Sequence, residues 1–284
     1  MRKILLYLKE FILRYYRLWK LRDLTLSDKL SFSFAVPISI IRSLTLKKKY
    51  INYLGKKFNY DDITLPFSLL TYPYEVSLHV LSQIRTSGEL NNILDIGGNI
   101  GQFSVTIASI SDAKNIDVFE PNPEIFEILE ENSSDYPQIN LYKYGVGKSG
   151  TFPFFYRQNK SATGSLIKEN SDKKIDEDIK NVKIKVTNDV VKLTKRSSYD
   201  LIKIDVEGTE FEVLKNLSGL KTKYLYLEIS TDRGKSYRTS EIYDLINNRF
   251  GKFEIIYQDE VHNNFACFNV LIHFPENKLK SEGK

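Results

Sequence analysis

Glycines and acids follow a short apolar run in the first half of the chain. Residues 91–104 read Asn-Asn-Ile-Leu-Asp-Ile-Gly-Gly-Asn-Ile-Gly-Gln-Phe-Ser. The apolar run ends in glycines and passes directly into a helical pattern, as a buried parallel strand does when it turns into a helix. Because glycine has no Cβ, Gly97, Gly98 and Gly101 let the backbone turn tightly and approach a ligand closely.

A second apolar run ends in an acid nineteen residues after Gly101. In Val118-Phe119-Glu120-Pro121, the side chain of Glu120 stands where an acid can accept hydrogen bonds from ribose hydroxyls. Pro121 cannot continue a strand ladder, so the strand ends there. Strand, glycine turn, helix, strand and acid together predict a nucleoside-binding half-fold. The alternative is that Glu120 is only an exposed acid at the end of a strand.

Three more acids surround a second glycine turn. The sequence Asp200-Leu-Ile-Lys-Ile-Asp-Val-Glu-Gly-Thr-Glu210 places Asp205 at a strand end and Glu207 and Glu210 around the start of a helix. Negative charge is favoured at a helix N-terminus, so helix capping is one interpretation of Glu207 and Glu210. Three carboxylates exceed what capping requires, and a clustered acid is suited to take a proton from a substrate hydroxyl.

Strand and helix patterns alternate from residue 93 onwards, which indicates parallel strands joined by right-handed crossovers. The expected strands are 93–97, 115–120, 139–146, 201–206, 224–229, 253–258 and 269–274, and the expected helices are 100–110, 123–133, 208–217 and 239–249. The last two strands have no helix between them, so we expect an antiparallel hairpin. Ligands of such α/β sheets bind beyond the carboxyl ends of the strands, here beside the strand at 93–97.

The composition divides the chain into regions. We expect a basic amphipathic helical arm at 1–50, lead-in helices at 51–90 including 74–84, a catalytic domain at 91–275 and a frayed tail at 276–284. Within the catalytic domain, residues 147–200 form an insertion on the substrate side. Its expected elements are strands at 151–156 and 182–186, a mobile polar loop at 158–178 and a short helix at 189–193.

Positive charge is concentrated in the arm. Residues 1–50 carry 12 Lys and Arg against 3 Asp and Glu, whereas residues 51–284 carry 29 against 33. The slightly acidic body argues against tracking of a nucleic-acid backbone by the core. Residues 1–22 follow an amphipathic helical pattern, with charges too frequent for a membrane span and no cleavage site of a signal peptide. This helix packs on its own domain or a partner subunit, or it lies on an anionic membrane surface.

Cysteine and histidine are scarce. The single Cys267 excludes an internal disulfide and a cysteine-based zinc cluster, and it fits a reducing, cytoplasmic location, with the inner membrane face as the peripheral alternative. The three histidines are too scattered to suggest a metal site. We interpret His79 as a packed or surface residue rather than a catalytic base. The sequence gives no indication of the oligomeric state.

The first glycine motif resembles the first motif of the S-adenosylmethionine-dependent methyltransferases. It reads Asp95-Ile-Gly-Gly-Asn-Ile-Gly101. Asp95 suits an ammonium group better than a phosphate, which a carboxylate would repel. S-adenosylmethionine has an amino-acid end and no phosphate, so this acid favours it over a dinucleotide.

Together with Phe119-Glu120-Pro121 and Lys203-Ile-Asp-Val-Glu-Gly-Thr-Glu210, this motif resembles the FkbM family of methyltransferases over about residues 91–230. The resemblance implies a Rossmann-like seven-stranded methyltransferase sheet, S-adenosylmethionine as donor, and methyl transfer to a hydroxyl of a sugar, glycan or related natural product. It places Asp205, Glu207 and Glu210 near the reacting centre. It places these residues around the donor: Asp95, Gly97, Gly98, Asn99, Gly101, Glu120 and Pro121.

Several alternatives stay open at this stage. Asp205 or Glu207 is the expected base, with His262 as second choice. No metal site is assigned, although Asp205 with Glu207 is suited to hold Mg²⁺. The rival functions are an RNA methyltransferase that uses the basic arm as a clamp, and a binding protein that kept the fold without the chemistry.

Overall fold

The structure is a computed structural model. It describes residues 26–46, 49–61, 76–84, 90–157, 160–165, 178–185, 187–230, 239–259 and 267–275, together with Ile12, Tyr15, Tyr16, Trp19, Pro66, Leu69 and Tyr72. Most of the predicted helix at 1–22, the predicted tail at 276–284 and the alternative base His262 therefore lie outside the described residues.

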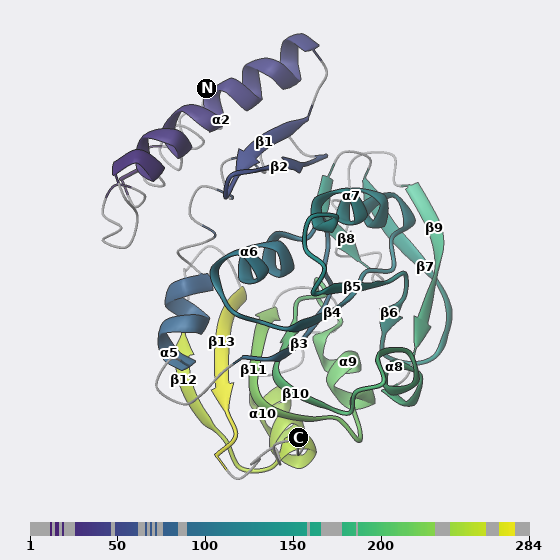
Figure 1. The fold of residues 1–284 in the computed structure, drawn as a ribbon. Helices are drawn as coiled ribbons and strands as arrows, with labels where there is room; N and C mark the ends of the chain where they lie inside the picture. Colours follow the sequence, from purple (N-terminus) through teal and green to yellow (C-terminus); the bar gives the residue numbers. More distant parts are fainter. Residues whose placement is uncertain are drawn as a thin grey trace.

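A seven-stranded sheet forms the centre of the molecule (Figure 1). Its order is β12-β13-β11-β10-β3-β4-β5, and its strands are β3 (Asn92–Ile96), β4 (Asn115–Phe119), β5 (Ile139–Tyr142), β10 (Ser198–Ile204), β11 (Lys221–Ser230), β12 (Glu254–Gln258) and β13 (Cys267–His273). β13 runs antiparallel to both its neighbours, whereas β11, β10, β3, β4 and β5 are parallel. This confirms the predicted α/β class, the Rossmann-like sheet and the terminal hairpin. The strand order reverses beside β3, as predicted.

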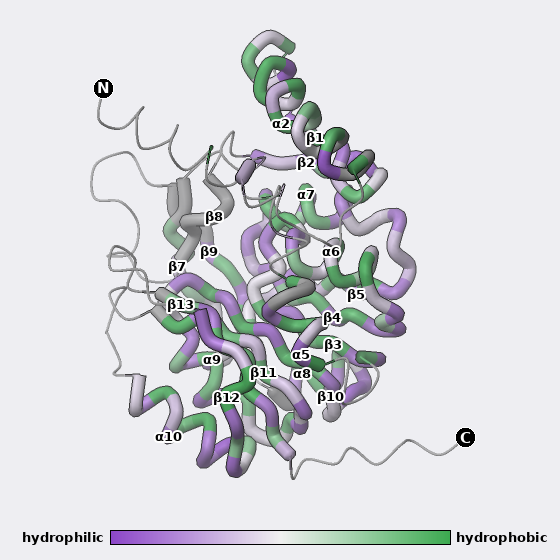
Figure 2. Tube along the Cα trace, turned by 90° about the vertical axis from the view of Figure 1, so that its left-hand side faces the viewer, coloured by the Kyte–Doolittle hydropathy of each residue, from purple (hydrophilic) through white to green (hydrophobic). Residues whose placement is uncertain are grey.

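Helices cover both faces of this sheet because successive strand residues point to opposite sides. On one face Ile93 packs with α6 (Gln102–Ile110) and α7 (Pro123–Ser133). On the other face Leu94 and Ile96 pack with α9 (Glu210–Asn216) and α10 (Thr239–Phe250). Figure 2 shows these hydrophobic segments inside the body of the molecule.

The start of α7 shows how local sequence sets an element. Asn122 precedes the helix, and its side-chain oxygen accepts a hydrogen bond from the Glu124 backbone N–H at 3.1 Å. Such a cap satisfies one of the free donors of the first turn. Pro123 follows at the first helical position, where its missing N–H costs little.

Residues 145–185 include a second sheet of order β6-β9-β7-β8, most of it within the insertion predicted at 147–200. Its strands are β6 (Gly145–Val146), β7 (Gly150–Arg157), β8 (Lys160–Ser165) and β9 (Asp178–Lys185), and α8 (Thr187–Thr194) follows. The strand predicted at 139–146 was too long, because a tight turn after Tyr142 sends residues 145–146 into this sheet. The polar loop predicted at 158–178 was also partly wrong. Residues 160–165 pair with β7, since main-chain pairing does not require apolar side chains.

The lead-in contains a hairpin as well as helices, which differs from the expectation for 51–90. β1 (Tyr50–Tyr53) and β2 (Lys56–Asn59) pair antiparallel. Leu54 and Gly55 both have positive φ, which matches the turns that join tightly connected strands. The helix predicted at 74–84 is present as a π-helical turn, η1 (Ser77–Leu81), followed by α5 (Ser82–Ile84).

α2 (Leu26–Leu46) lies beyond the hairpin, on the outside of the molecule (Figure 1). Within the arm at 1–22, the four described residues are helical. The structure shows, for the residues it describes, no helix that is both long and apolar enough to cross a membrane.

Candidate active site

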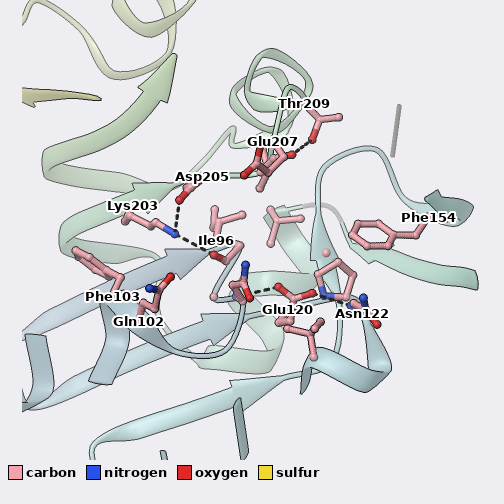
Figure 3. A pocket seen from close by; sticks show the side chains of 18 of the residues that line it. Ile96, Gln102, Phe103, Glu120, Asn122, Phe154, Lys203, Asp205, Glu207 and Thr209 are labelled. Atoms are coloured by element: carbon pink, nitrogen blue, oxygen red, sulfur yellow. Dashed lines mark hydrogen bonds and ion pairs between the residues drawn. The ribbon is translucent and has the colours of Figure 1, made fainter. Parts of the chain in front are cut away.

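A pocket opens at the carboxyl ends of β3, β4 and β10 (Figure 3). Its empty volume is about 980 Å³, part of which is open to solvent. Seven of the ten predicted site residues line it: Gly97, Gly98, Asn99, Glu120, Pro121, Asp205 and Glu207. The structure therefore brings the three sequence motifs together at the predicted edge of the sheet.

The turn after β3 requires glycine because two other strands press against it. A Cβ on Gly97 would lie 1.9 Å from the backbone oxygen of Asp205, and φ at Gly97 is +86°. A Cβ on Gly98 would lie 2.2 Å from Val118 Cγ1. The N–H groups of both glycines donate to the carbonyl oxygen of Phe119, each at 3.0 Å. These two hydrogen bonds therefore hold the backbone of the turn against the end of β4, where the turn lines the pocket.

Glu120 is buried at the end of β4 and faces the pocket (Figure 3). Its Oε2 accepts a hydrogen bond from the Asn99 N–H at 2.9 Å, and its Oε1 accepts one from the Asn122 N–H at 2.8 Å. Burial raises the pKa of Glu120 to about 7, although these two hydrogen bonds act in the opposite direction. Each carboxylate oxygen still has a second lone pair for a ligand hydroxyl.

Lys203 is the central cation of the site, and the sequence analysis gave it no role. Its Nζ donates to the carbonyl oxygen of Gly97 at 2.9 Å and lies 3.2 Å from Asp95 Oδ1 and 3.4 Å from Asp205 Oδ2. Burial lowers the pKa of Lys203, but the two aspartates raise it and the net shift is upward. The available signal was a lysine between two isoleucines in a strand that otherwise reads as buried.

Asp95, Gly101 and Glu210 do not line the pocket. Asp95 is fully buried beneath the turn, and its Oδ1 lies 3.2 Å from the Lys203 ammonium nitrogen. Burial raises the pKa of Asp95, and the nearby Lys203 ammonium opposes this shift. The role predicted for Asp95 in donor binding stays a prediction, and Lys203 pairs with both Asp95 and Asp205.

Gly101 and Glu210 shape the two helices that border the pocket. Gly101 has φ +91° and directly precedes α6. Glu210 Oε1 accepts a hydrogen bond from the Gly208 N–H at 2.8 Å, which is the capping interpretation of this acid. Burial raises the pKa of Glu210 to about 7, and this hydrogen bond opposes the shift.

Acids gather where β10 and β11 end. Asp205, Glu207 and Glu228 each offer a carboxylate oxygen, and these oxygens all lie within 4.8 Å of one another. Glu207 has φ +53°, a left-handed backbone that costs a non-glycine residue about 1 kcal/mol. Such strain collects at functional sites, where the surrounding structure holds it in place.

A second pocket adjoins the first and shares Tyr72, Lys203 and Asp205 with it. Its other lining residues are Val76, His79, Ile204, Tyr226, Glu228 and Asn269. His79 is buried, as the packed interpretation expected, and its Nδ1 lies 3.0 Å from the Tyr226 hydroxyl. The lining of this second pocket therefore combines charged and hydroxyl groups with the apolar side chains of Val76 and Ile204.

The second sheet contributes apolar wall to the first pocket. Phe154 of β7 and Ile184 of β9 both line it, and they pack together with Val182. Figure 3 shows the Phe154 ring opposite Glu120 and Asn122. The sequence analysis placed the insertion on the substrate side but named no residue in it.

The FkbM methyltransferase domain family matches residues 95–252. This match spans more than half of the chain and includes all three motifs. The chain belongs to the FkbM methyltransferase family.

Curated relatives agree with this assignment. Hexuronic acid methyltransferase AglP of Haloferax volcanii is 31% identical over 49% of this chain and 55% of its own. Methyltransferase sdnD of Sordaria araneosa is 28% identical over 44% of this chain and 60% of its own. This FkbM chain thus spans little more than half the length of these relatives.

Solved structures share the fold alone. The fibrillarin pre-rRNA processing protein of Methanococcus jannaschii is 14% identical, with a TM-score of 0.41 over 68% of this chain and 74% of its own. An rRNA methylase from Streptococcus thermophilus is 12% identical, with a TM-score of 0.41 over 68% of this chain and 93% of its own.

The family and the fold imply S-adenosylmethionine as cofactor, and the pocket fits it. A buried carboxylate, Glu120, faces the pocket where the second strand of a nucleoside-binding fold ends. The glycines let the turn pack closely against Val118 of β4 and Asp205 after β10, where a Cβ would collide, and the turn itself lines the pocket. Phe154 and Pro121 add apolar wall against which a purine base can pack.

Proposed function

We propose that this FkbM protein transfers the methyl group of S-adenosylmethionine to a hydroxyl of a sugar, glycan or related natural product. The observation that carries the proposal is the junction of the two pockets. The glycine turn and Glu120 lie on one side, a polar pocket lies on the other, and Asp205 and Lys203 line both.

The residues of the first pocket would hold the donor by its two polar ends. Glu120 would accept hydrogen bonds from the ribose hydroxyls, because its carboxylate is already oriented by two backbone N–H groups. The turn at Gly97 to Asn99 would face the amino-acid portion. Among the described residues that line the pocket, Lys203 is the one lysine or arginine, and this suits a donor that carries no phosphate.

Bound S-adenosylmethionine would supply an electrophilic methyl group on a sulfonium sulfur. The protein's main task would be to align the acceptor oxygen with that carbon, which can contribute several kcal/mol. Asp205 or Glu207 would accept the proton of the hydroxyl. Lys203 would hold Asp205 in place, since its ammonium lies 3.4 Å from Asp205 Oδ2.

The acceptor class is supported by the second pocket and by one relative. Tyr226, Glu228 and Asn269 bring hydroxyl, carboxylate and amide groups, which are the types of group that bind sugar hydroxyls, to the lining of this pocket. The relative from Haloferax volcanii is a hexuronic acid methyltransferase. A sugar acid is therefore the first acceptor to test.

A requirement for Mg²⁺ is a second, more specific proposal about how the methyl transfer is catalysed. Mg²⁺ prefers oxygen ligands in octahedral geometry, and Asp205, Glu207 and Glu228 could each contribute one. If these acids hold Mg²⁺, EDTA should abolish methyl transfer and added Mg²⁺ should restore it. Full activity in EDTA would indicate that the carboxylate base acts without a bound metal ion.

The decisive experiment has two steps. Calorimetry with S-adenosylmethionine should show binding by the wild-type protein and at least tenfold weaker binding by Glu120→Ala. A transfer screen with methyl-labelled donor should then cover free hexuronic acids, sugar nucleotides, cell-envelope glycans and RNA. Absence of donor binding would support a non-catalytic binding protein, and labelled RNA would support the RNA methyltransferase.

The proposed function also includes a location of the protein in the cytoplasm. The lone cysteine fits a reducing compartment, where S-adenosylmethionine is available. Fractionation of cells that express the tagged protein should recover it in the cytosol or at the inner membrane face.

A further inference from the structure

The helix α2 carries its apolar side chains on the outside. Leu26, Leu30, Phe34, Ile38, Ile41 and Leu44 are all exposed, with 64% exposure at Phe34 and 69% at Leu44. At 100° per residue these six positions fall within one face of the helix. We call these six residues the α2 stripe.

The opposite face attaches α2 to the hydrophobic core through Val36, Ala35 and Ile40, and to the hairpin through a polar contact. Val36 and Ser39 are fully buried there, and the Ser39 carbonyl oxygen accepts a hydrogen bond from the Tyr60 hydroxyl at 3.1 Å. Pro37 has no N–H, so the Ser33 carbonyl lacks its usual helical donor. The Tyr15 hydroxyl donates to that carbonyl instead. The helix is thus fixed in an orientation that turns its apolar face away from the core.

Exposed apolar side chains are concentrated in this part of the molecule. Among the described residues, twelve large hydrophobic side chains are exposed, and ten of them lie between residues 12 and 46. The other two are Leu193 and Ile255, in different parts of the body. A concentrated apolar patch marks a surface that contacts another apolar phase or molecule, whereas scattered residues need no explanation.

The charge around the stripe identifies the contact. Residues 1–50 carry 12 basic against 3 acidic residues, and at 100° per residue Lys29 and Arg42 of α2 lie on either side of the stripe. Tyr16 and Trp19, in the preceding helical residues, are also exposed. An apolar face with surrounding basic residues and interfacial aromatics is the combination that binds anionic lipid surfaces.

We propose that α2 lies in the interface of an anionic lipid bilayer, with the α2 stripe among the acyl chains and the surrounding basic residues at the headgroups. For residues 1–22, such a contact was one of the alternatives that the sequence left open. The described residues assign the larger apolar surface to α2. This inference does not depend on the proposed methyl transfer.

Flotation with vesicles tests the proposal on the full chain. The protein should float with phosphatidylcholine vesicles that contain phosphatidylglycerol, and at least tenfold less with pure phosphatidylcholine vesicles. The variant F34E/I38E/I41E should lose flotation with the anionic vesicles by a similar factor. The matched control L193E/I255E adds acids at exposed apolar residues elsewhere and should float as the wild type does.

The single tryptophan provides a second readout. Trp19 is 45% exposed and neighbours α2 through the hydrogen bond from Lys29 Nζ to its carbonyl oxygen. Its emission should shift to shorter wavelength when anionic vesicles are added to the wild type, and should not shift in the stripe variant.

Two outcomes would overturn the membrane contact. Wild-type protein that stays unbound to anionic vesicles, or stripe and control variants that float equally, would remove α2 from the interface. The stripe would instead contact a second copy of the chain if light scattering showed a wild-type dimer that the stripe substitutions dissociate, and if the wild type did not float with vesicles. Unchanged thermal unfolding midpoints of both variants would show that the substitutions leave the fold intact.

Discussion

Glu120 combines a buried position with two backbone hydrogen bonds, and this makes its ionisation sensitive to pH near neutrality. Its pKa is raised to about 7 by burial. Only the ionised form can accept hydrogen bonds at every lone pair, so donor binding should favour that form.

We therefore predict that the dissociation constant for S-adenosylmethionine falls severalfold as the pH rises from 6 to 8. Glu120→Gln should bind more weakly and lose most of this dependence, because an amide does not ionise in this range. Calorimetry at several pH values measures both effects. Glu210→Gln is the matched control, since Glu210 has a similar pKa but lies outside the pocket. Equal pH profiles for wild type and Glu120→Gln would contradict the assignment.

Glu210 should affect stability rather than binding. Burial raises its pKa from 4.5 to about 7, so the folded state binds a proton more tightly than the unfolded state does. The free energy of unfolding should therefore decrease as the pH rises from about 4.5 through 7, at up to about 1.4 kcal/mol per pH unit. Glu210→Gln should flatten this part of the profile, as measured by urea unfolding at pH 5 and 8. If the stability of Glu210→Gln depended on pH as strongly as that of the wild type, other titratable groups would be responsible for the pH dependence.

Lys203 joins residues that are far apart in the sequence, and its loss should affect both folding and binding. Lys203→Met leaves Asp95 buried without its cation, and a broken buried pair costs about 3–5 kcal/mol. The variant D95N/K203M removes both charges and should recover part of that loss, as urea unfolding would show. Donor binding should stay weak in both variants if Lys203 holds the Gly97 turn. If Lys203→Met bound S-adenosylmethionine as tightly as the wild type does, Lys203 would contribute to folding stability and not to donor binding.

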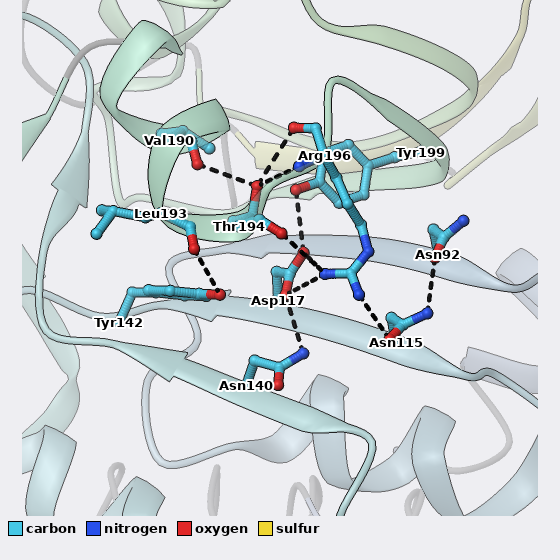
Figure 4. Close-up of polar contacts among 10 residues, drawn as sticks. All are labelled: Asn92, Asn115, Asp117, Asn140, Tyr142, Val190, Leu193, Thr194, Arg196 and Tyr199. Carbon is cyan, nitrogen blue, oxygen red and sulfur yellow. Dashed lines mark hydrogen bonds and ion pairs between the residues drawn. The ribbon is translucent and has the colours of Figure 1, made fainter.

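At the level of elements, a polar network ties strands β4, β5 and β10 to the loop that follows α8 (Figure 4). Asp117 of β4 is fully buried and accepts hydrogen bonds from Arg196, Tyr199 and Asn140 at 3.0–3.2 Å. Arg196 also donates to Asn115 at 2.7 Å. Burial raises the pKa of Asp117, and Arg196 opposes that shift.

Arg196→Met should therefore lower the free energy of unfolding by about 3 kcal/mol, because Asp117 would keep its burial and lose its cation. The double variant D117N/R196M should be more stable than Arg196→Met alone. Urea unfolding measures the difference, and donor binding should remain unchanged because none of these residues lines the pocket. A loss below about 0.5 kcal/mol would mean that Arg196 behaves as an exposed surface residue.

Other elements act as connectors between the parts of the protein. Asn132 of α7 accepts a hydrogen bond from the Asn59 N–H at 2.7 Å and donates to the Ile100 carbonyl oxygen at 2.8 Å. It thereby links the N-terminal hairpin to the segment that carries the glycine turn. The insertion sheet reaches the same pocket from the other side through Phe154 and Ile184.

For the whole molecule, the arrangement separates three tasks. The central sheet holds the proposed donor pocket at its strand ends, the insertion and Tyr72 of the lead-in complete the wall, and α2 offers a surface on the outside (Figure 1). A methyltransferase held at a membrane by α2 would meet acceptors that are themselves bound there, which links the two proposals without making either depend on the other.

The sequence alone determined the fold class, the positions of the main strands and helices, and the two glycine turns with their acids. These features are local: an apolar run, a Pro or Asn at a helix start, and glycines at a strand end restrict the backbone without any distant partner. α7, predicted at 123–133, has these bounds in the structure because its cap and proline are adjacent in the chain.

Only the tertiary structure decided what lies beside what. Asp95, Lys203 and Tyr226 occupy the same register position on three adjacent strands, although more than a hundred residues separate the first two. The second sheet, the capping position of Glu210 and the outward face of α2 likewise depend on contacts between distant segments. Local patterns restrict each segment by itself, but register and packing across strands depend on all segments at once, so the centre formed by Lys203 emerged only in three dimensions.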